Sequence, residues 1–512
     1  MSLKDIRLAP LENPDSSMWI DEAIWGHMLY DEQLPWLVYL EFLNVAFSHD
    51  RDGHLLAEPH GLNKLRYRAC WRLELRNILF NNPKMEEIRL RFSNEDVRWR
   101  DWCKTMSRAG GLPQPDFAYL RERFSSFDDF AEVVGLFRLN AIEGETNKRW
   151  TSKYVFPYGR DCIYEDLDNN AATNDRHFFR RTGELLYLML SRSSSVDELR
   201  KVLKCRLLYP SSVWNRLAAC LQPPRADEKG AERANAFLPY PRHRCYDALA
   251  SDWLSILALQ MPGYDPLPYI IDMTGLHIVL YQLSIAQELC GERTPVRLIC
   301  EAVAPKKTLV RELSCEVYQS NNHLPAQAIT SFLDDVESSE DWQAALQQPE
   351  AFSRCRTVLQ SKVLWPMRDS DYEGDRDPLP MMAELRESAK RRHLQHVANI
   401  HRNYGRAVGL VSRRGTNKLR YAPTDELLKA LIFANVTVRQ EFAQFLARLF
   451  ERYGIVFGDR EASLALDKGE FELKAFQANA RRLEQRLASL GLLKRLSDGC
   501  AYVLNPYSRS PS

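Results

Sequence analysis

The part of the chain with the clearest chemical meaning lies near its C-terminal end, where residues 388–421 contain no Asp or Glu. Cations without neighbouring acids suit the phosphates of a nucleic acid, because each phosphate contact releases condensed counterions. A solubilising surface is the alternative, but such surfaces normally mix both signs of charge. This run therefore predicts a nucleic-acid-binding segment, with contacts from Lys390, Arg391, Arg392, Arg402, Arg406, Arg413, Arg414, Lys418 and Arg420.

The distribution of charge along the whole chain agrees with this prediction. The net charge is +1, but residues 388–512 hold 22 Lys/Arg against 11 Asp/Glu, a balance of +11. Residues 1–387 hold 47 against 57, a balance of −10. Charge that is segregated in this way predicts different partners for the two parts: duplex DNA for the basic part and proteins for the acidic N-terminal part.

An acidic cluster offers an alternative chemistry. Asp161, Glu165, Asp166 and Asp168 could hold Mg²⁺ as nucleases do. No Glu-x-Lys or Asp-x-Lys pair follows at strand spacing, and the basic group from Arg176 to Arg181 could simply pair with these acids. A metal-dependent nuclease using Asp161–Asp168 therefore remains the alternative, and we predict no catalytic residue.

Three other patterns do not predict chemistry. His393, His396 and His401 could bind a metal, but they have cationic neighbours and no nearby carboxylate or thiolate, so no metal is expected. No phosphate loop of the Gly-x-x-x-x-Gly-Lys-Ser/Thr kind is present, and no cofactor is expected. The spacing of Trp99 and Trp102 is more typical of a core than of base stacking.

The elements that would position the basic residues can be read from the C-terminal sequence. Thr424 is a helix N-cap before Asp425 and Glu426, and a second helix spans 438–453 before Gly454. A short β run at 455–457 precedes a third helix from about Phe471 to Gly491. Two apolar runs then flank Ser497-Asp-Gly499, a strong hairpin signal.

This order of helix, helix, short strand, helix and hairpin resembles the winged-helix superfamily from Pro423 to Pro506. The resemblance implies a third helix laid toward a duplex and a hairpin wing beside it, with contacts from Lys474, Arg481, Arg482, Arg486, Lys494 and Arg495. The superfamily also contains many protein–protein modules, and the third helix carries Glu470, Glu472 and Glu484. A structural assembly subunit without nucleic-acid contact is therefore a further alternative.

Two C-terminal phrases, Tyr421–Ala430 and Leu492–Tyr502, resemble those of uncharacterised proteins encoded in bacterial anti-phage defence clusters. The resemblance covers this end of the chain alone and brings no catalytic residues. It implies a non-enzymatic DNA-binding adaptor subunit of a bacterial defence or genome-maintenance complex.

The rest of the chain predicts a mainly α, multidomain fold. We expect a mostly helical domain at 1–221, a mixed α/β domain at 236–330, an acidic linker at 331–387 and the basic winged-helix-like domain at 388–512. In the middle domain, Val296–Val303 and Thr308–Tyr318 are predicted as strands.

Cysteine usage and apolar segments predict the location of the protein. Eleven cysteines are spread singly without a Cys-x-x-Cys pair, a pattern typical of reduced thiols. Met1–Asp15 lacks the apolar region of a secretory signal. The longest apolar stretch, Tyr269–Cys290, carries Asp272, His277 and Glu288, so we expect a buried helix and no membrane contact. The predicted location is cytoplasmic.

Overall fold

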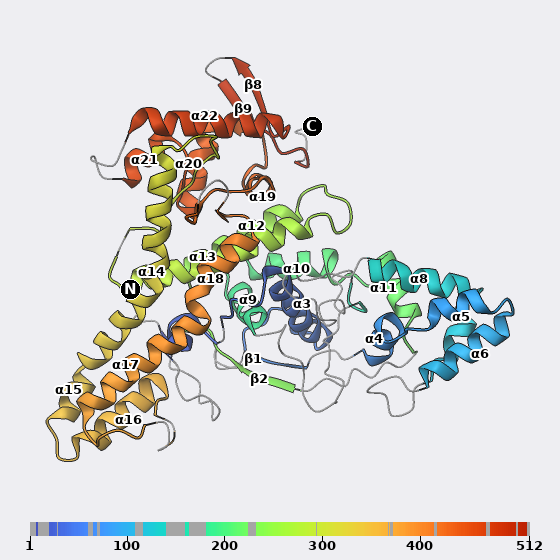
Figure 1. The fold of residues 1–512 in the computed structure, drawn as a ribbon, viewed down its shortest axis with the longest axis horizontal. Helices are drawn as coiled ribbons and strands as arrows, with labels where there is room; N and C mark the ends of the chain where they lie inside the picture. Colours follow the sequence, from blue (N-terminus) through green and yellow to red (C-terminus); the bar gives the residue numbers. More distant parts are fainter. Residues whose placement is uncertain are drawn as a thin grey trace.

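The structure is a computed structural model. It describes residues 7–8, 20–27, 29–59, 65–68, 72–107, 116–139, 159–162, 181–223, 232–292, 294–366, 368, 372–413, 417–466, 472–497 and 500–508. These residues are mainly helical, as the sequence predicted, with a few short strands (Figure 1).

The centre of the molecule is α13 (Leu267–Leu289), the predicted apolar helix. It is long and apolar enough to cross a membrane, but 89% of its most apolar window is buried inside the protein. Around it lie α3 (Pro35–Arg51), α12 (Arg244–Leu257), α14 (Leu309–Glu337), α18 (Val397–Ala407) and α19 (Asp425–Asn435). A further helix, α9 (Thr182–Ser191), packs against α3 and α12. Gly275 permits this packing, because a Cβ there would come within 2.8 Å of Val408 on one side and Pro35 on the other. The observed burial confirms that this stretch is a core helix.

Asp272 on α13 gives a test of this burial. Burial, with Glu426 nearby, raises the pKa of Asp272 to about 7. Between about pH 4 and pH 7 the folded protein keeps a proton that the unfolded chain loses, so this group's contribution to stability falls as pH rises through that window. Asp272→Asn should therefore match the wild type near pH 4 and exceed its free energy of unfolding by roughly 1–3 kcal/mol at pH 8. Urea unfolding at both pH values measures this difference, and an equal effect at the two pH values would contradict it.

The middle of the chain corrects the strand predictions. Residues 308–318 begin a long helix, α14 (Leu309–Glu337), which Thr308 caps with its side chain. Buried Val310, Leu313 and Ser314 recur at three- and four-residue spacing, which overrides the β-branched and aromatic composition. Of the predicted strand at 296–303, only β3 (Leu298–Ile299) is observed. The regular structure of the region predicted as mixed α/β is therefore mainly helical.

Residues 331–387, for which the acidic composition predicted a linker, also lie largely in helices. They contain the end of α14, α15 (Glu340–Leu346), α16 (Ala351–Val363) and the start of α17 (Pro378–Gln395). Trp342, Leu359 and Val363 are completely buried in the main hydrophobic core. The acids mark the solvated face of these helices, because charged residues also dominate the outside of an amphipathic helix.

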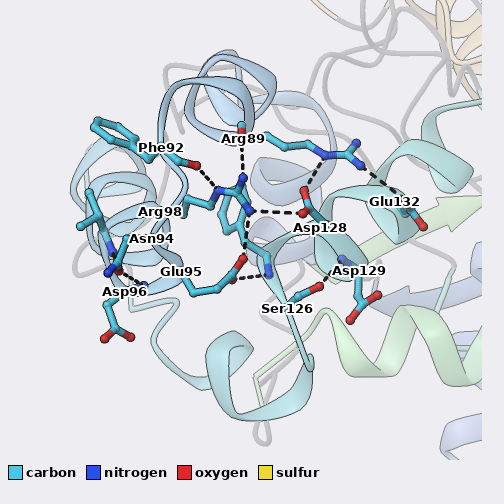
Figure 2. Close-up of polar contacts among 12 residues, drawn as sticks. Arg89, Phe92, Asn94, Glu95, Asp96, Arg98, Ser126, Asp128, Asp129 and Glu132 are labelled. Atoms are coloured by element: carbon cyan, nitrogen blue, oxygen red, sulfur yellow. Dashed lines mark hydrogen bonds and ion pairs between the residues drawn. The ribbon is translucent and has the colours of Figure 1, made fainter.

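A second hydrophobic core lies in the N-terminal region. It is built by helices at the right of Figure 1: α4 (Leu73–Phe80), α5 (Met85–Arg91), α6 (Glu95–Met106), α7 (Tyr119–Arg123), α8 (Phe127–Leu139) and α11 (Val213–Cys220). Trp99 and Trp102 are 4% and 0% exposed, which confirms their prediction as core residues. Arg98 beside them bonds to Asp128 and Glu95, so it also has a structural role (Figure 2).

The remaining N-terminal elements contribute to the main core. They are α2 (Ile20–Trp25), α10 (Val196–Arg206) and the antiparallel pair of β1 (Leu65–Arg68) with β2 (Glu232–Ala236). Leu199 and Leu203 of α10, like Ile20 and Ile24 of α2, are buried in the main core. These elements therefore belong to the same packing unit as α13.

The C-terminal elements follow the predicted order of helices and hairpin. After α19 come β6 (Gln440–Glu441), α20 (Phe442–Tyr453), β7 (Ile455–Val456), α21 (Asp459–Ala465) and α22 (Leu473–Ser489), then β8 (Leu493–Ser497) and β9 (Cys500–Val503). One three-stranded antiparallel sheet has the order β6–β9–β8. The short run predicted within the module, β7, pairs instead in parallel with β3. Backbone hydrogen bonds between β7 and β3 thus connect the C-terminal elements to the middle of the chain.

Candidate nucleic-acid interface

The cations predicted to bind nucleic acid fall into three groups. The first group lies on α17, the second on α18 and the hairpin of β4 (Val411–Ser412) with β5 (Arg420–Tyr421), and the third on α22 and β8. Figure 1 places α17 at the lower left and α22 at the top, so the first and third groups lie on different parts of the molecule. Arg414 lies outside the described residues. Residues 388–395 and 397–407 of the acid-free run lie in helices, at the end of α17 and in α18.

The α17 group has acidic partners from outside the acid-free run. Lys390 pairs with Glu387 at 2.8 Å and Arg391 with Glu384 at 3.3 Å. Arg392 pairs with Glu22 of α2 at 2.9 Å. Lys390 and Arg391 remain 63% and 70% exposed, and ion pairs at an exposed surface contribute little to stability. Arg392, in contrast, connects α17 to α2 through its hydrogen bond to Glu22.

Arg420 is not available to a nucleic acid, which corrects its prediction as a contact residue. Its side chain is completely buried and pairs with the equally buried Glu301. Arg311 completes this buried triad, with its Nε 2.9 Å from the other carboxylate oxygen of Glu301. Glu301 thus links Arg420 of β5 to Arg311 of α14. The role of Arg420 is therefore structural.

Arg402, Arg406 and Arg413 all act electrostatically on the phenol of Tyr318 on α14, and we name these four residues the Tyr318 basic cluster. Burial raises the pKa of Tyr318 to about 12, and all three guanidinium groups are close enough to oppose that rise. The Tyr318 ring stacks on His401 with centroids 4.7 Å apart. Positive charge from α18 and from the β4–β5 hairpin therefore converges on one side of α14.

The members of this cluster differ in how strongly they are held. Arg402 donates to Asn399 at 2.8 Å and to Asn403 at 3.3 Å, which are neutral partners. Arg406 and Arg413 are exposed, and within the described part of the chain their side chains have no hydrogen-bond or ion-pair partner. Lys418 is exposed on the same hairpin, where it acts electrostatically on Cys315 one turn before Tyr318. Arg406 and Arg413 can therefore bind a phosphate without first breaking an ion pair with a carboxylate.

Half of the third group holds the C-terminal elements together. Arg486 donates to Asp425 at 2.6 Å and to the Pro423 carbonyl at 2.8 Å. Arg482 donates to the Ala302 carbonyl at 3.2 Å, and Arg495 lies 3.7 Å from Glu484. Arg482 and Arg486 therefore both have protein partners on neighbouring elements, and their contact with a nucleic acid stays a prediction.

The other half of the third group remains accessible. Lys474 and Arg481 are exposed on one side of α22, seven positions apart, and Lys494 is exposed on β8. The opposite side of α22 is docked through Asn479, which donates to the carbonyls of Cys300 and Phe457 and accepts from the Ala302 amide. Only one side of α22 could therefore face a partner.

Of the acidic cluster that could serve a nuclease, the structure describes Asp161. Asp161 accepts from Asn215 at 2.8 Å and lies 3.6 Å from Arg72, so its carboxylate has structural partners. Glu165, Asp166 and Asp168 lie outside the described residues, as do Arg176, His177 and Arg180. Arg181 pairs with Glu184 at 2.8 Å.

The three histidines of the basic run do not converge. His393 lies beside Asp21, His396 lies 3.2 Å from Asp31, and His401 bonds to the Tyr421 hydroxyl at 2.8 Å. Burial lowers the pKa of His393 to about 4 and that of His401 to about 3, so both are neutral at pH 7. Across the described ranges, no group of three or more His, Cys, Asp or Glu side chains is placed to hold a metal ion.

Sequence reasoning missed Tyr318, because a single tyrosine far from the basic run carries no local signal. The helical spacing of α14 could have revealed which of its faces meets α18, since Tyr318, Asn321 and Pro325 lie on one stripe and are buried. Comparison of the chain with protein-family models, with curated proteins and with solved structures gives no match. The function therefore has to be argued from the site itself.

Proposed function

We propose that this protein is a non-enzymatic cytoplasmic subunit that binds duplex DNA through its C-terminal part and protein partners through its acidic N-terminal part. The observation that carries the proposal is the Tyr318 basic cluster, in which Arg406 and Arg413 have no acidic partner among the described residues. Exposed cations of this kind are suited to phosphate contacts, and phosphate contacts supply most non-specific affinity for DNA. The resemblance to anti-phage defence proteins favours a defence or genome-maintenance complex.

The C-terminal elements support the same proposal independently. The helices α19, α20 and α22 and the sheet of order β6–β9–β8 resemble a winged-helix module, with α21 as an additional helix before α22. In such a module the last helix and the hairpin approach a duplex. Lys474, Arg481, Lys494 and Arg495 are the exposed cations among the described residues of these two elements. A pure assembly role for the module is the alternative, favoured by the use of Arg482 and Arg486 in protein contacts.

Salt dependence tests the proposal most directly. The full-length protein should bind a labelled duplex in a gel-shift titration, and about six phosphate contacts would reduce its affinity roughly a thousandfold between 50 and 200 mM salt. The purified protein should leave the duplex uncut in the presence of Mg²⁺. Absence of binding at 50 mM salt would contradict the proposal, and Mg²⁺-dependent cleavage would favour the nuclease alternative instead.

A second comparison separates the module from the Tyr318 basic cluster. If α22 and the hairpin contact the duplex, the triple variant Lys474→Ala, Arg481→Ala, Lys494→Ala should bind more weakly, with a salt slope that is flatter by roughly one unit for each phosphate no longer neutralised. All three side chains are exposed, so the fold should be retained. An unchanged salt slope would make the module an assembly surface and leave the cluster as the DNA contact.

A further inference from the structure

A polar cleft of about 600 Å³ lies between α2 and the second half of α17. Its walls include Asp21 and Glu22 from α2, Tyr30, Trp365, and Arg392 and His396 from the end of α17. This volume is within the usual range for small-molecule sites. Neither the charge pattern nor the motifs of the sequence point to it.

Two buried carboxylates lie in the wall of this cleft. Asp21 and Glu22 are 6% and 2% exposed. Glu22 Oε1 accepts from Arg392 at 2.9 Å, whereas Glu22 Oε2 and Asp21 Oδ1 are buried without a hydrogen-bond partner among the described residues. The other oxygen of Asp21 is 3.9 Å from Arg392 Nε, beyond hydrogen-bond range. Such buried acceptors are costly unless a donor satisfies them.

The donors around the cleft are engaged elsewhere. Arg391 donates to Glu384 at 3.3 Å and to Ser388 at 3.1 Å, and His396 lies 3.2 Å from Asp31. His393 Nδ1 is 3.9 Å from Asp21 Oδ1. Asp21 and Glu22 share the guanidinium of Arg392 as their arginine ion-pair partner, and Arg181 also favours the charged form of Glu22.

The protonation of the two acids reflects this environment. Burial raises the pKa of Asp21 to about 6 and that of Glu22 to about 7, and the charge of Arg392 only partly opposes the rise. A cation with several N–H donors would supply both missing hydrogen bonds and place a positive charge beside the two carboxylates. A primary ammonium group has three such donors, and the Tyr30 and Trp365 rings in the wall favour a cation as well.

We propose that the cleft between α2 and α17 binds a primary ammonium group, which Asp21 and Glu22 recognise by hydrogen bonds and charge. The group can belong to a free polyamine or to a lysine side chain of another protein, and the chemistry at the two carboxylates is the same. The site does not depend on nucleic-acid binding.

Calorimetry on the full-length protein at pH 8 tests the proposal with two probes, spermidine and a short peptide containing a single lysine. At least one should bind, and its analogue with a quaternary ammonium, which lacks N–H donors, should bind at least tenfold more weakly. Binding of spermidine alone identifies a polyamine as the source, and binding of the peptide identifies a protein. Failure of both probes at millimolar concentration would overturn the proposal.

Variants connect the binding to the cleft. Asp21→Asn should weaken binding of the probe at least tenfold and keep the fold, since Asp21 makes no short hydrogen bond through its side chain in the described structure. Glu22→Gln should act in the same direction. The matched control is Glu387→Gln, which removes an exposed acid of the neighbouring helix, α17, and should leave the affinity unchanged. Equal affinity in Asp21→Asn and the control, with equal melting temperatures, would show binding to the acidic exterior and overturn the proposal.

Discussion

Replacing Arg406 and Arg413 with Ala should weaken binding of duplex DNA by the full-length protein about ten- to a hundredfold near 100 mM salt. Both side chains are exposed and have no polar partner in the described part of the chain, so their charge is available to phosphates. The slope of log affinity against log salt should fall by roughly two units, one for each phosphate that the variant no longer neutralises. A gel-shift or fluorescence titration at three salt concentrations measures both quantities.

The matched control removes the same charge elsewhere. Lys104 and Lys201 are exposed residues of the N-terminal part, and their replacement by Ala should leave both affinity and slope nearly unchanged. Melting temperatures should agree among the three proteins, because exposed substitutions usually change stability by less than about 0.5 kcal/mol. If the control weakens binding as much as the Arg406 and Arg413 variant does, the binding reflects overall charge and the Tyr318 basic cluster has no special role.

The buried triad leads to the largest effect on stability. Glu301→Ala should reduce the free energy of unfolding by about 3–5 kcal/mol, because it leaves the charges of Arg311 and Arg420 in the interior without a carboxylate. Urea unfolding followed by circular dichroism measures this reduction. Glu312→Ala is the matched control on the same stretch of chain, since its pair with Lys307 is exposed and should contribute less than about 1 kcal/mol.

The same pair of variants also tests the structural role assigned to Arg420. If Arg420 held DNA instead, Glu301→Ala would free its guanidinium and leave stability nearly intact. A reduction in stability below about 1 kcal/mol would therefore contradict the buried triad. A further variant, Arg420→Met, should be destabilising as well, since it removes one of the two cations that bond to the buried carboxylate.

The sequence predicted the local elements well where the signal is local. The cap at Thr424, the left-handed Gly454 that ends α20 and the hairpin around Ser497-Asp-Gly499 are each specified by a few adjacent residues. The prediction of strands at 308–318 was wrong, because the burial pattern along α14 depends on packing against α13, α18 and β5 that no short window contains.

The candidate site was predictable only as a set of cations. Residue type cannot distinguish exposed Arg413 from buried Arg420. Arg420 is buried with a carboxylate partner, Glu301, that lies more than a hundred positions away in the sequence. The absence of acids from residues 388–421 was also misleading, since Glu387 and Glu384 precede it by less than two helical turns. The acids of the cleft were missed for the same reason, because Glu22 meets Arg392 across 370 positions.

The pairing of β3 with β7 has a consequence for how the protein is made. Leu298 and Ile299 are completely buried and pair with Ile455 and Val456. More than 150 further residues must therefore be translated before this strand pair can form. Until then the nascent chain exposes that strand edge and the apolar side of α14. Contacts of such long sequence separation slow folding and leave surfaces prone to aggregation. The pairing of β3 can therefore form only after residue 456 has been translated, and a chain that ends before residue 455 would keep the unpaired edge.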